Sequence, residues 1–229
     1  MKLWKIFQET DPEYIDLMEN NIITYNSKYS SFCEENDEFT SQAYKWLKCQ
    51  YKVANPNNYL FPWHLYYKVE GSTDPLNNKL FGISSLGNYI AIIFDIPDNQ
   101  VLLYDDDLFI ICLNRGYLSL TEQEDNEFEQ YSRFLPKLGI DLYKVFNEDY
   151  FIKLNQSQQN LAKTYLQKVY QSWKRIFNIH LPANCWISCA DKTILGLTWE
   201  LKKNDITDII NFTVTEHQYT TYWNNCNYV

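Results

Sequence analysis

The chain of 229 residues is long enough for one large domain or two small ones, and it can bury a core without disulfide or metal staples. It carries 20 Lys and Arg against 29 Asp and Glu, a formal net charge of −9, which excludes a fold-wide basic footprint for duplex DNA. Aromatic residues make up 17% of the chain and Gly only 6 residues, which leaves little material for a glycine-rich phosphate loop.

The first half of the chain alternates strand and helix patterns. A strand is expected at residues 2–8, and a short helix follows it. Thr10, Pro12 and Glu13 favour a helix start, and Asn20-Asn21 ends the helix because Asn tolerates the left-handed conformation. The next expected elements are an extended stretch at 22–25, a polar loop at 26–40, a helix at 41–53, a turn at 55–58, a strand at 64–69 and a loop at 71–88.

The second half predicts buried strands and two longer helices. Thr121 and Glu124 have the spacing of a capping box, which indicates a helix start. The expected elements are strands at 89–96 and 101–104, an apolar segment at 108–113, helices at 121–135 and 157–177, and strands at 194–202 and 209–215. This order indicates an α+β fold with mixed or antiparallel sheets and peripheral helices. We expect a single domain over residues 1–229, with 205–229 either inside it or forming a C-terminal extension.

Cysteine spacing and hydropathy exclude two further classes. None of the 6 cysteines forms a CxxC pair or has a His at ligand spacing, so no zinc or other metal site is expected and the thiols are interpreted as reduced and mostly buried. No run of about 18 apolar residues and no apolar signal core is present, so we expect a cytoplasmic protein without a membrane segment. The chain also lacks GxSxG, Walker and GxGxxG motifs, which argues against common hydrolases, P-loop NTPases and dinucleotide-binding Rossmann enzymes.

Four residues are candidates for a site. Glu200 shares one face of the expected strand 194–202 with Thr198 and Lys202, so it either points into a cleft or pairs with a neighbouring lysine at a sheet edge. Lys5 lies on the first strand. Tyr44 and Trp63 have flat rings that either stack on a nicotinamide or nucleobase or pack in the core.

A further pattern is the acidic run Asp105-Asp106-Asp107. Three adjacent acids can hold a hard cation, but successive residues in an extended chain point apart. We expect a solvated hairpin turn here, and a metal-dependent nuclease is the weakest of the functional alternatives.

Several segments, taken in order, resemble the bacterial domain-of-unknown-function family numbered 3841 over residues 2 to about 205. They are Lys2-Leu3-Trp4, Ala43-Tyr44-Lys45-Trp46-Leu47, Pro62-Trp63, Phe94 to Leu103, Leu113-Asn114, Ser172-Trp173-Lys174-Arg175-Ile176-Phe177 and Leu197-Thr198-Trp199-Glu200-Leu201-Lys202. The family label carries no activity. The layout of its first strand and its late Trp-Glu strand is in turn similar to ADP-ribosyltransferases, including toxins of toxin–antitoxin and phage-defence modules.

That second resemblance implies an enzyme, an NAD-dependent ADP-ribosyltransferase acting as a bacterial toxin or phage-defence effector on RNA, DNA or protein. It implies that Glu200 is catalytic, that Lys5 contacts the ribose or phosphate of NAD, and that Tyr44 or Trp63 stacks on nicotinamide. Lys5 stands where the transferases carry His or Arg. NAD would be the substrate, and an antitoxin or chaperone protein a partner. The alternative is a non-catalytic binding component of a toxin–antitoxin or defence module.

Overall fold

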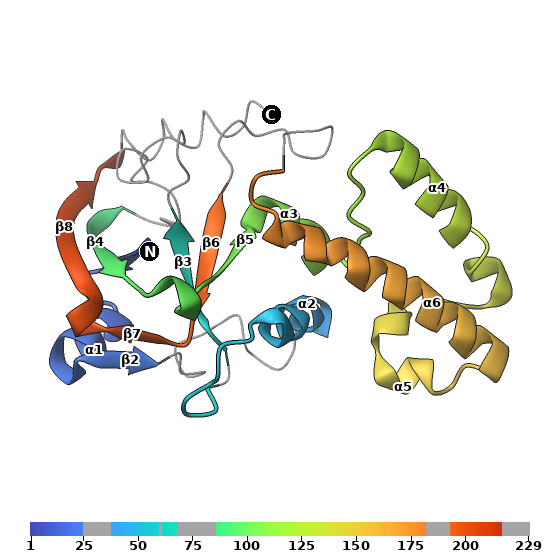
Figure 1. Cartoon of the computed structure of the whole chain (residues 1–229), viewed down its shortest axis with the longest axis horizontal. Helices are drawn as coiled ribbons and strands as arrows, with labels where there is room; N and C mark the ends of the chain where they lie inside the picture. Colours follow the sequence, from blue (N-terminus) through green and yellow to red (C-terminus); the bar gives the residue numbers. More distant parts are fainter. Residues whose placement is uncertain (25–37, 60, 68–85, 182–192, 217–229) are drawn as a thin grey trace. The chain divides into compact units, whose positions relative to one another are not determined.

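The computed structural model describes residues 1–24, 38–59, 61–67, 86–181 and 193–216 (Figure 1). The chain divides into two compact units. We call the first the sheet unit, which comprises residues 1–34, 51–103 and 193–229, and the second the helical unit, which comprises residues 35–50 and 104–192. The expectation of a single domain stays a prediction. Most of the loops expected at 26–40 and 71–88 lie outside the described residues.

The sheet unit is built on a six-stranded sheet in the order β5-β6-β3-β1-β4-β8. Its elements are β1 (Lys2–Gln8), α1 (Pro12–Asn20), β2 (Ile22–Thr24), β3 (Trp63–Tyr67), β4 (Gly87–Asp95), β6 (Ile194–Thr198), β7 (Glu200–Lys202), β8 (Ile206–Val214) and the start of β5 (Leu102–Asp105), whose second half belongs to the helical unit. The pairs β1·β3, β1·β4, β3·β6 and β4·β8 are antiparallel. The expected α+β class is therefore confirmed in its coarse form.

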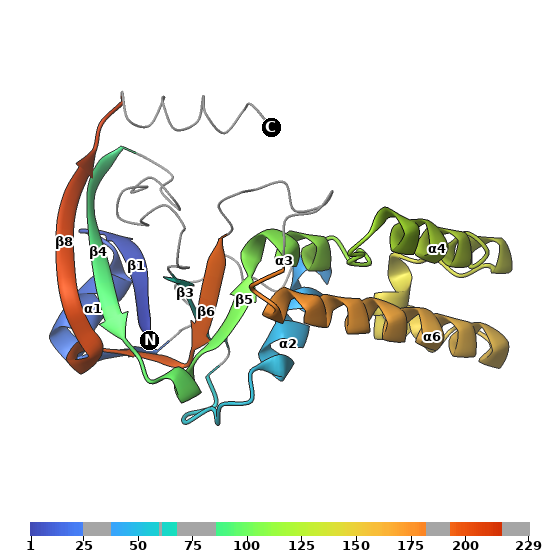
Figure 2. The same ribbon diagram turned by 45° about the horizontal axis from the view of Figure 1, so that its top comes forward.

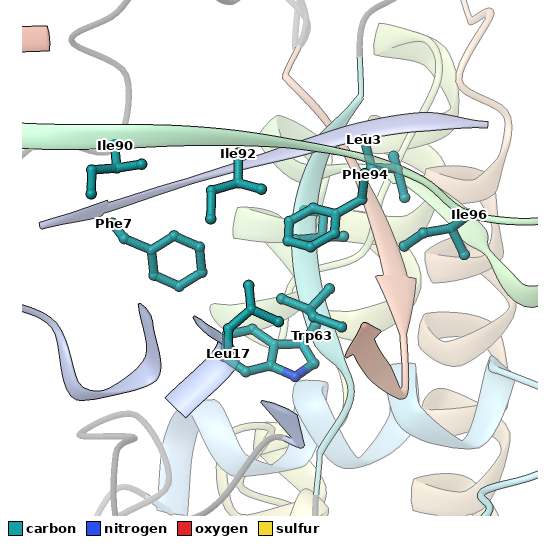
Figure 3. Close-up of a cluster of buried hydrophobic side chains, with 10 residues drawn as sticks. Leu3, Phe7, Leu17, Trp63, Ile90, Ile92, Phe94 and Ile96 are labelled. Carbon is teal, nitrogen blue, oxygen red and sulfur yellow. The ribbon is translucent and has the colours of Figure 1, made fainter. Parts of the chain in front are cut away.

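The core of the sheet unit lies on one face of the sheet. Because side chains alternate along a strand, Leu3, Lys5 and Phe7 of β1 share that face. Figure 3 shows the apolar members of this face packed together. The buried cluster consists of Leu3, Phe7, Leu17, Trp63, Leu65, Ile90, Ile92, Phe94, Ile96 and Leu201. Lys5 is thus a lysine on the apolar face of a central strand, which is an unusual position for a charged group.

One expectation about the C-terminal part needs correction. The single strand expected at 194–202 is two strands, because the chain leaves the main sheet at Trp199 and β7 pairs with β2 in a second, two-stranded sheet. Leu201 of β7 packs in the core cluster. Residues 206–214 form β8, close to the strand expected at 209–215, and β8 runs along β4 at the edge of the main sheet (Figure 2).

The helical unit contains α2 (Glu38–Gln50), α3 (Asp106–Leu113), α4 (Glu122–Ser132), α5 (Glu148–Phe151) and α6 (Gln156–Trp173), and α4 runs beside α6 in both views (Figures 1 and 2). The segment Asp105–Asp107 is not a hairpin turn. Asp105 is buried and caps α3, its carboxylate accepting a hydrogen bond from the Leu108 amide at 3.0 Å. Acidic residues stabilise such a helix start, since they face the positive end of the helix dipole.

The segment Ser172–Arg175 holds the helical unit together. Ser172 Oγ accepts a hydrogen bond from the Leu118 amide at 3.0 Å, and Trp173 Nε1 donates to the Gly116 carbonyl at 2.7 Å. Arg175 forms a bidentate ion pair with Glu124. Burial opposes ionisation of Glu124, but hydrogen bonds from Arg175, Leu120 and Tyr117 lower its pKa to about 2. In the described ranges, no helix is both long and apolar enough to cross a membrane.

Candidate functional site

Glu200 is the first residue of β7, directly after the point where the chain leaves the main sheet. The preceding Trp199 anchors this point. Its indole Nε1 donates to the Val53 carbonyl at 2.9 Å, and its ring lies 5.2 Å from that of Tyr51. The buried Trp199 side chain therefore fixes the backbone at this point, and the next residue, Glu200, points in the opposite direction. The Glu200 side chain is 15% exposed, so it lies at the rim of the unit and is not sealed in the core.

Both oxygens of the Glu200 carboxylate are engaged. Oε1 accepts a hydrogen bond from the Tyr59 hydroxyl at 3.0 Å and one from Asn57 Nδ2 at 3.5 Å. Oε2 forms an ion pair with Lys202 Nζ at 3.2 Å. The lysine partner considered as the alternative is therefore present, but two groups from a distant loop share the carboxylate with it. We call Glu200, Tyr59, Asn57 and Lys202 the carboxylate cluster.

The loop that carries Tyr59 is itself held in place. The Asn55 side chain brackets Tyr59, because its Oδ1 accepts from the Tyr59 amide and its Nδ2 donates to the Tyr59 carbonyl, both at 2.8 Å. Asn58 adopts a left-handed conformation with φ 55°, which Asn tolerates better than most residues. Burial and the neighbouring Glu200 carboxylate raise the pKa of Tyr59, so its hydroxyl keeps the proton that it donates. The cluster is thus positioned before any ligand arrives.

Lys5 and Trp63 are brought together on the core face of the sheet. Lys5 Nζ lies 5.0 Å from the centre of the Trp63 ring and 5.7 Å from that of Phe7. Burial lowers the pKa of Lys5, and the carboxylates of Glu13 and Asp11 counteract this only in part. Burial likewise raises the pKa of Glu13. A buried lysine that faces aromatic rings and interacts with the carboxylates of Asp11 and Glu13 is a costly arrangement. Core packing alone does not require it.

His64, next to Trp63 in β3 but on the opposite face of the sheet, provides a pH-dependent prediction. Burial, and then the Lys5 cation, lower its pKa from 6.5 to about 3. Below pH 6.5 the unfolded chain binds a proton here that the folded chain does not, so stability is lost as the pH falls. Between pH 7.5 and pH 5, the wild type should lose about 2 kcal/mol more than His64→Gln. Urea unfolding at both pH values measures this difference.

The exposed His180 supplies the control, since His180→Gln makes the same chemical change outside the core. That variant should lose as much stability as the wild type over the same pH interval. An equal loss for the wild type and His64→Gln would contradict the buried neutral imidazole.

Both aromatic candidates pack against other residues of their own units. Trp63 is 1% exposed and belongs to the core cluster, so stacking on a nicotinamide would require the core to open. Tyr44 belongs to α2 in the helical unit, and its ring makes an edge contact of 5.3 Å with Phe109. Within the described residues, no hydrogen bond or ion pair joins Glu200 to Lys5. The structure therefore brings together Lys5 and Trp63 but leaves Glu200 in a cluster of its own.

Sequence reasoning anticipated Lys202 beside Glu200 but missed the loop partners of Glu200 and the acids near Lys5. Asn57 lies in the expected Asn-Pro-Asn-Asn turn, but its contact with Glu200 spans 143 residues. Glu13 was assigned only to the helix start. The described ranges contain no group of three or more His, Cys, Asp or Glu side chains that could hold a metal ion.

In the comparison with protein families, residues 3–207 match a family model described as "Domain of unknown function (DUF3841)". The matched range covers most of the chain and includes the carboxylate cluster, Lys5 and Trp63. Comparisons with curated proteins and with solved structures found no match.

Proposed function

The chain belongs to the domain-of-unknown-function family DUF3841, and we propose that it is an NAD-dependent ADP-ribosyltransferase with an ADP-ribosyltransferase-like sheet unit. The observation that carries the proposal is the carboxylate of Glu200, which is partly exposed at the rim and oriented through both oxygens. A preorganised carboxylate suits a reaction in which positive charge develops on a ribose ring, because it requires no reorganisation when the charge appears.

In the proposed reaction, the bond between C1′ of the ribose and the nicotinamide nitrogen breaks, and its electron pair leaves with nicotinamide. The carboxylate of Glu200 accepts a hydrogen bond from a ribose hydroxyl and stabilises the oxocarbenium-like charge. The acceptor atom of the target then bonds to C1′ and releases its proton to solvent. Lys5 would contact a ribose or phosphate oxygen, which requires NAD to reach the group formed with Trp63 and Phe7.

The wider biological role follows from the same proposal. We place the enzyme in the cytoplasm as a bacterial toxin or phage-defence effector that modifies RNA, DNA or protein. A toxin of this kind requires a neutralising partner protein. The net charge of −9 favours a basic docking surface on that partner.

Incubation of the purified protein with labelled NAD and a cell lysate tests the proposal. Label on RNA, DNA or protein that depends on the added enzyme would support transfer and would identify the class of target. NAD that remains intact, both with and without lysate, in the presence of folded protein would argue against the assignment.

The second candidate is a non-catalytic binding component, and one observation favours it. Several large apolar side chains of the helical unit are exposed, namely Ile110, Phe134, Leu138, Tyr143 and Ile152. Exposed apolar groups of this size are common on interaction surfaces. Release of nicotinamide from NAD in the presence of lysate separates the candidates, because only a transferase breaks that bond. Nicotinamide release by the wild type that is lost in Glu200→Gln would count against this second reading.

A further inference from the structure

The helical unit contains a cavity of about 470 Å³ with three basic side chains in its lining, although the chain as a whole is acidic. Arg115, Lys144 and Lys153 line it, together with one carboxylate, that of Asp149. Lys144 also forms a long ion pair of 3.5 Å with Asp141. The volume lies in the range of small-molecule sites, about 300–1,000 Å³. The excess of positive charge indicates that the cavity suits an anion.

Arg115 occupies a position that a side chain disfavours. It follows the end of α3 with φ 57°, in the left-handed region where helix ends usually carry Gly, and a glycine is in fact the next residue. A non-glycine residue held in this conformation is a recurrent feature of functional positions. The left-handed turn at this point directs the Arg115 side chain to the cavity instead of continuing the helix.

The guanidinium group is buried and fixed in orientation. Arg115 is 7% exposed, its Nη1 donates to the Tyr143 carbonyl at 2.6 Å, and its Cζ lies 5.5 Å from the centre of the Phe146 ring. A guanidinium is charged at every physiological pH and offers several parallel donors to the oxygens of a phosphate. Fixing it beforehand reduces the entropy lost when an anion binds.

Two tyrosines and Asn147 complete the lining. The Tyr150 hydroxyl accepts from the Asp141 amide at 2.8 Å and donates to the Gly139 carbonyl at 3.3 Å, so its ring is held in place. Tyr143 is 65% exposed, and its ring is therefore accessible at the mouth of the cavity. An exposed aromatic ring beside a fixed guanidinium and two lysines can stack on a nucleobase while the cations bind its phosphates.

We infer that this cavity binds a phosphorylated small molecule of nucleotide size, with Arg115, Lys144 and Lys153 on the phosphates and Tyr143 on the base. The site lies in the helical unit, whereas Glu200 lies in the sheet unit. The inference therefore stands independently of the proposed transferase activity.

Isothermal titration of the full-length protein with ADP tests this inference. The double variant Lys144→Gln/Lys153→Gln should bind ADP at least tenfold more weakly than the wild type, and both lysines are exposed, so the fold should be unaffected. Lys163→Gln, at an exposed position of α6 outside the cavity lining, should bind like the wild type. Adenosine, which lacks phosphate, should bind much more weakly, and inorganic phosphate should compete with ADP.

Three results would overturn the inference: no ADP binding by the wild type, equal binding by the double variant, or adenosine binding as tightly as ADP. Titration of Lys5→Met, whose lysine is proposed to contact a ribose or phosphate oxygen of NAD, distinguishes this site from the transferase site. Its ADP affinity should equal that of the wild type, and a loss of affinity there would assign ADP to the sheet unit instead.

Discussion

Replacing Glu200 by Gln is expected to lower NAD-dependent ADP-ribosyl transfer by about 10²–10³-fold, the usual effect of removing one group that stabilises transition-state charge. The amide preserves the shape of the side chain, and its oxygen can still accept the hydrogen bond from Tyr59. The ion pair with Lys202 is lost, but Lys202 is 44% exposed, so the free energy of unfolding should fall by less than about 1 kcal/mol. Label transfer and thermal unfolding of the same preparation measure both effects.

Glu19→Gln is the matched control for this experiment. Glu19 is an exposed glutamate of α1 in the same unit, and it is distant in sequence from the residues of the carboxylate cluster. Its substitution removes the same charge, and activity should stay unchanged. Full activity of Glu200→Gln would rule out its catalytic role. Equal losses in Glu200→Gln and Glu19→Gln would point to the overall charge of the unit instead of to one carboxylate.

The carboxylate cluster illustrates which parts of a site a sequence can reveal. Glu200 was found because it follows a tryptophan at the end of an apolar strand. Tyr59 was not found, since its contact with Glu200 spans 141 residues and depends on a loop that Asn55 fixes. The break of the strand at Trp199 also has no local signal, because neither Gly nor Pro stands there. The tertiary contacts of Trp199 with Tyr51 and Val53 accompany this break.

The elements that were predicted well are those with local signals at their ends. Helix α1 ends at the left-handed Asn21, and α4 begins at the cap formed by Thr121, as the sequence indicates. Helix α3 was missed because its apolar residues occupy all sides of a short helix, and such a run cannot be distinguished from a buried strand by periodicity. Its true start signal was Asp105, which acts as a helix cap.

The segment Ser172–Phe177, one of those that resemble the family, has a structural explanation. Trp173 lies among the rings of Trp46, Phe146 and Tyr170, at centroid distances of 5.3, 6.0 and 5.0 Å. Arg175 is bound to Glu124. These contacts account for the motif through packing and ion pairing within the helical unit. Family membership based on this motif therefore supports the fold more strongly than any activity, and the functional argument depends on Glu200 and Lys5.

Lys5→Met is expected to raise stability and lower activity at the same time. Methionine has a similar length and no charge, so it removes the cost of burying a cation on the core face, and the free energy of unfolding at pH 7 should increase by about 1–3 kcal/mol. If Lys5 binds an oxygen of NAD, the loss of a charge-assisted hydrogen bond should lower transfer by about 10–100-fold. Urea unfolding and label transfer measure the two effects.

The pH dependence of stability shows whether the stability gain of Lys5→Met comes from removal of the lysine charge or from another cause. Because burial lowers the pKa of Lys5 in the folded state, there is a pH range in which the unfolded chain holds a proton that the folded chain releases, and wild-type stability should rise with pH through that range up to the ordinary lysine pKa of about 10.4. Lys5→Met should lack this rise, whereas Lys2→Met, at an exposed position of the same strand, should keep it. A gain in stability without loss of transfer would make Lys5 a costly core residue and remove it from the NAD site. Natural proteins tolerate such a cost mainly where function requires the group, so the paired result decides whether the lysine serves the reaction.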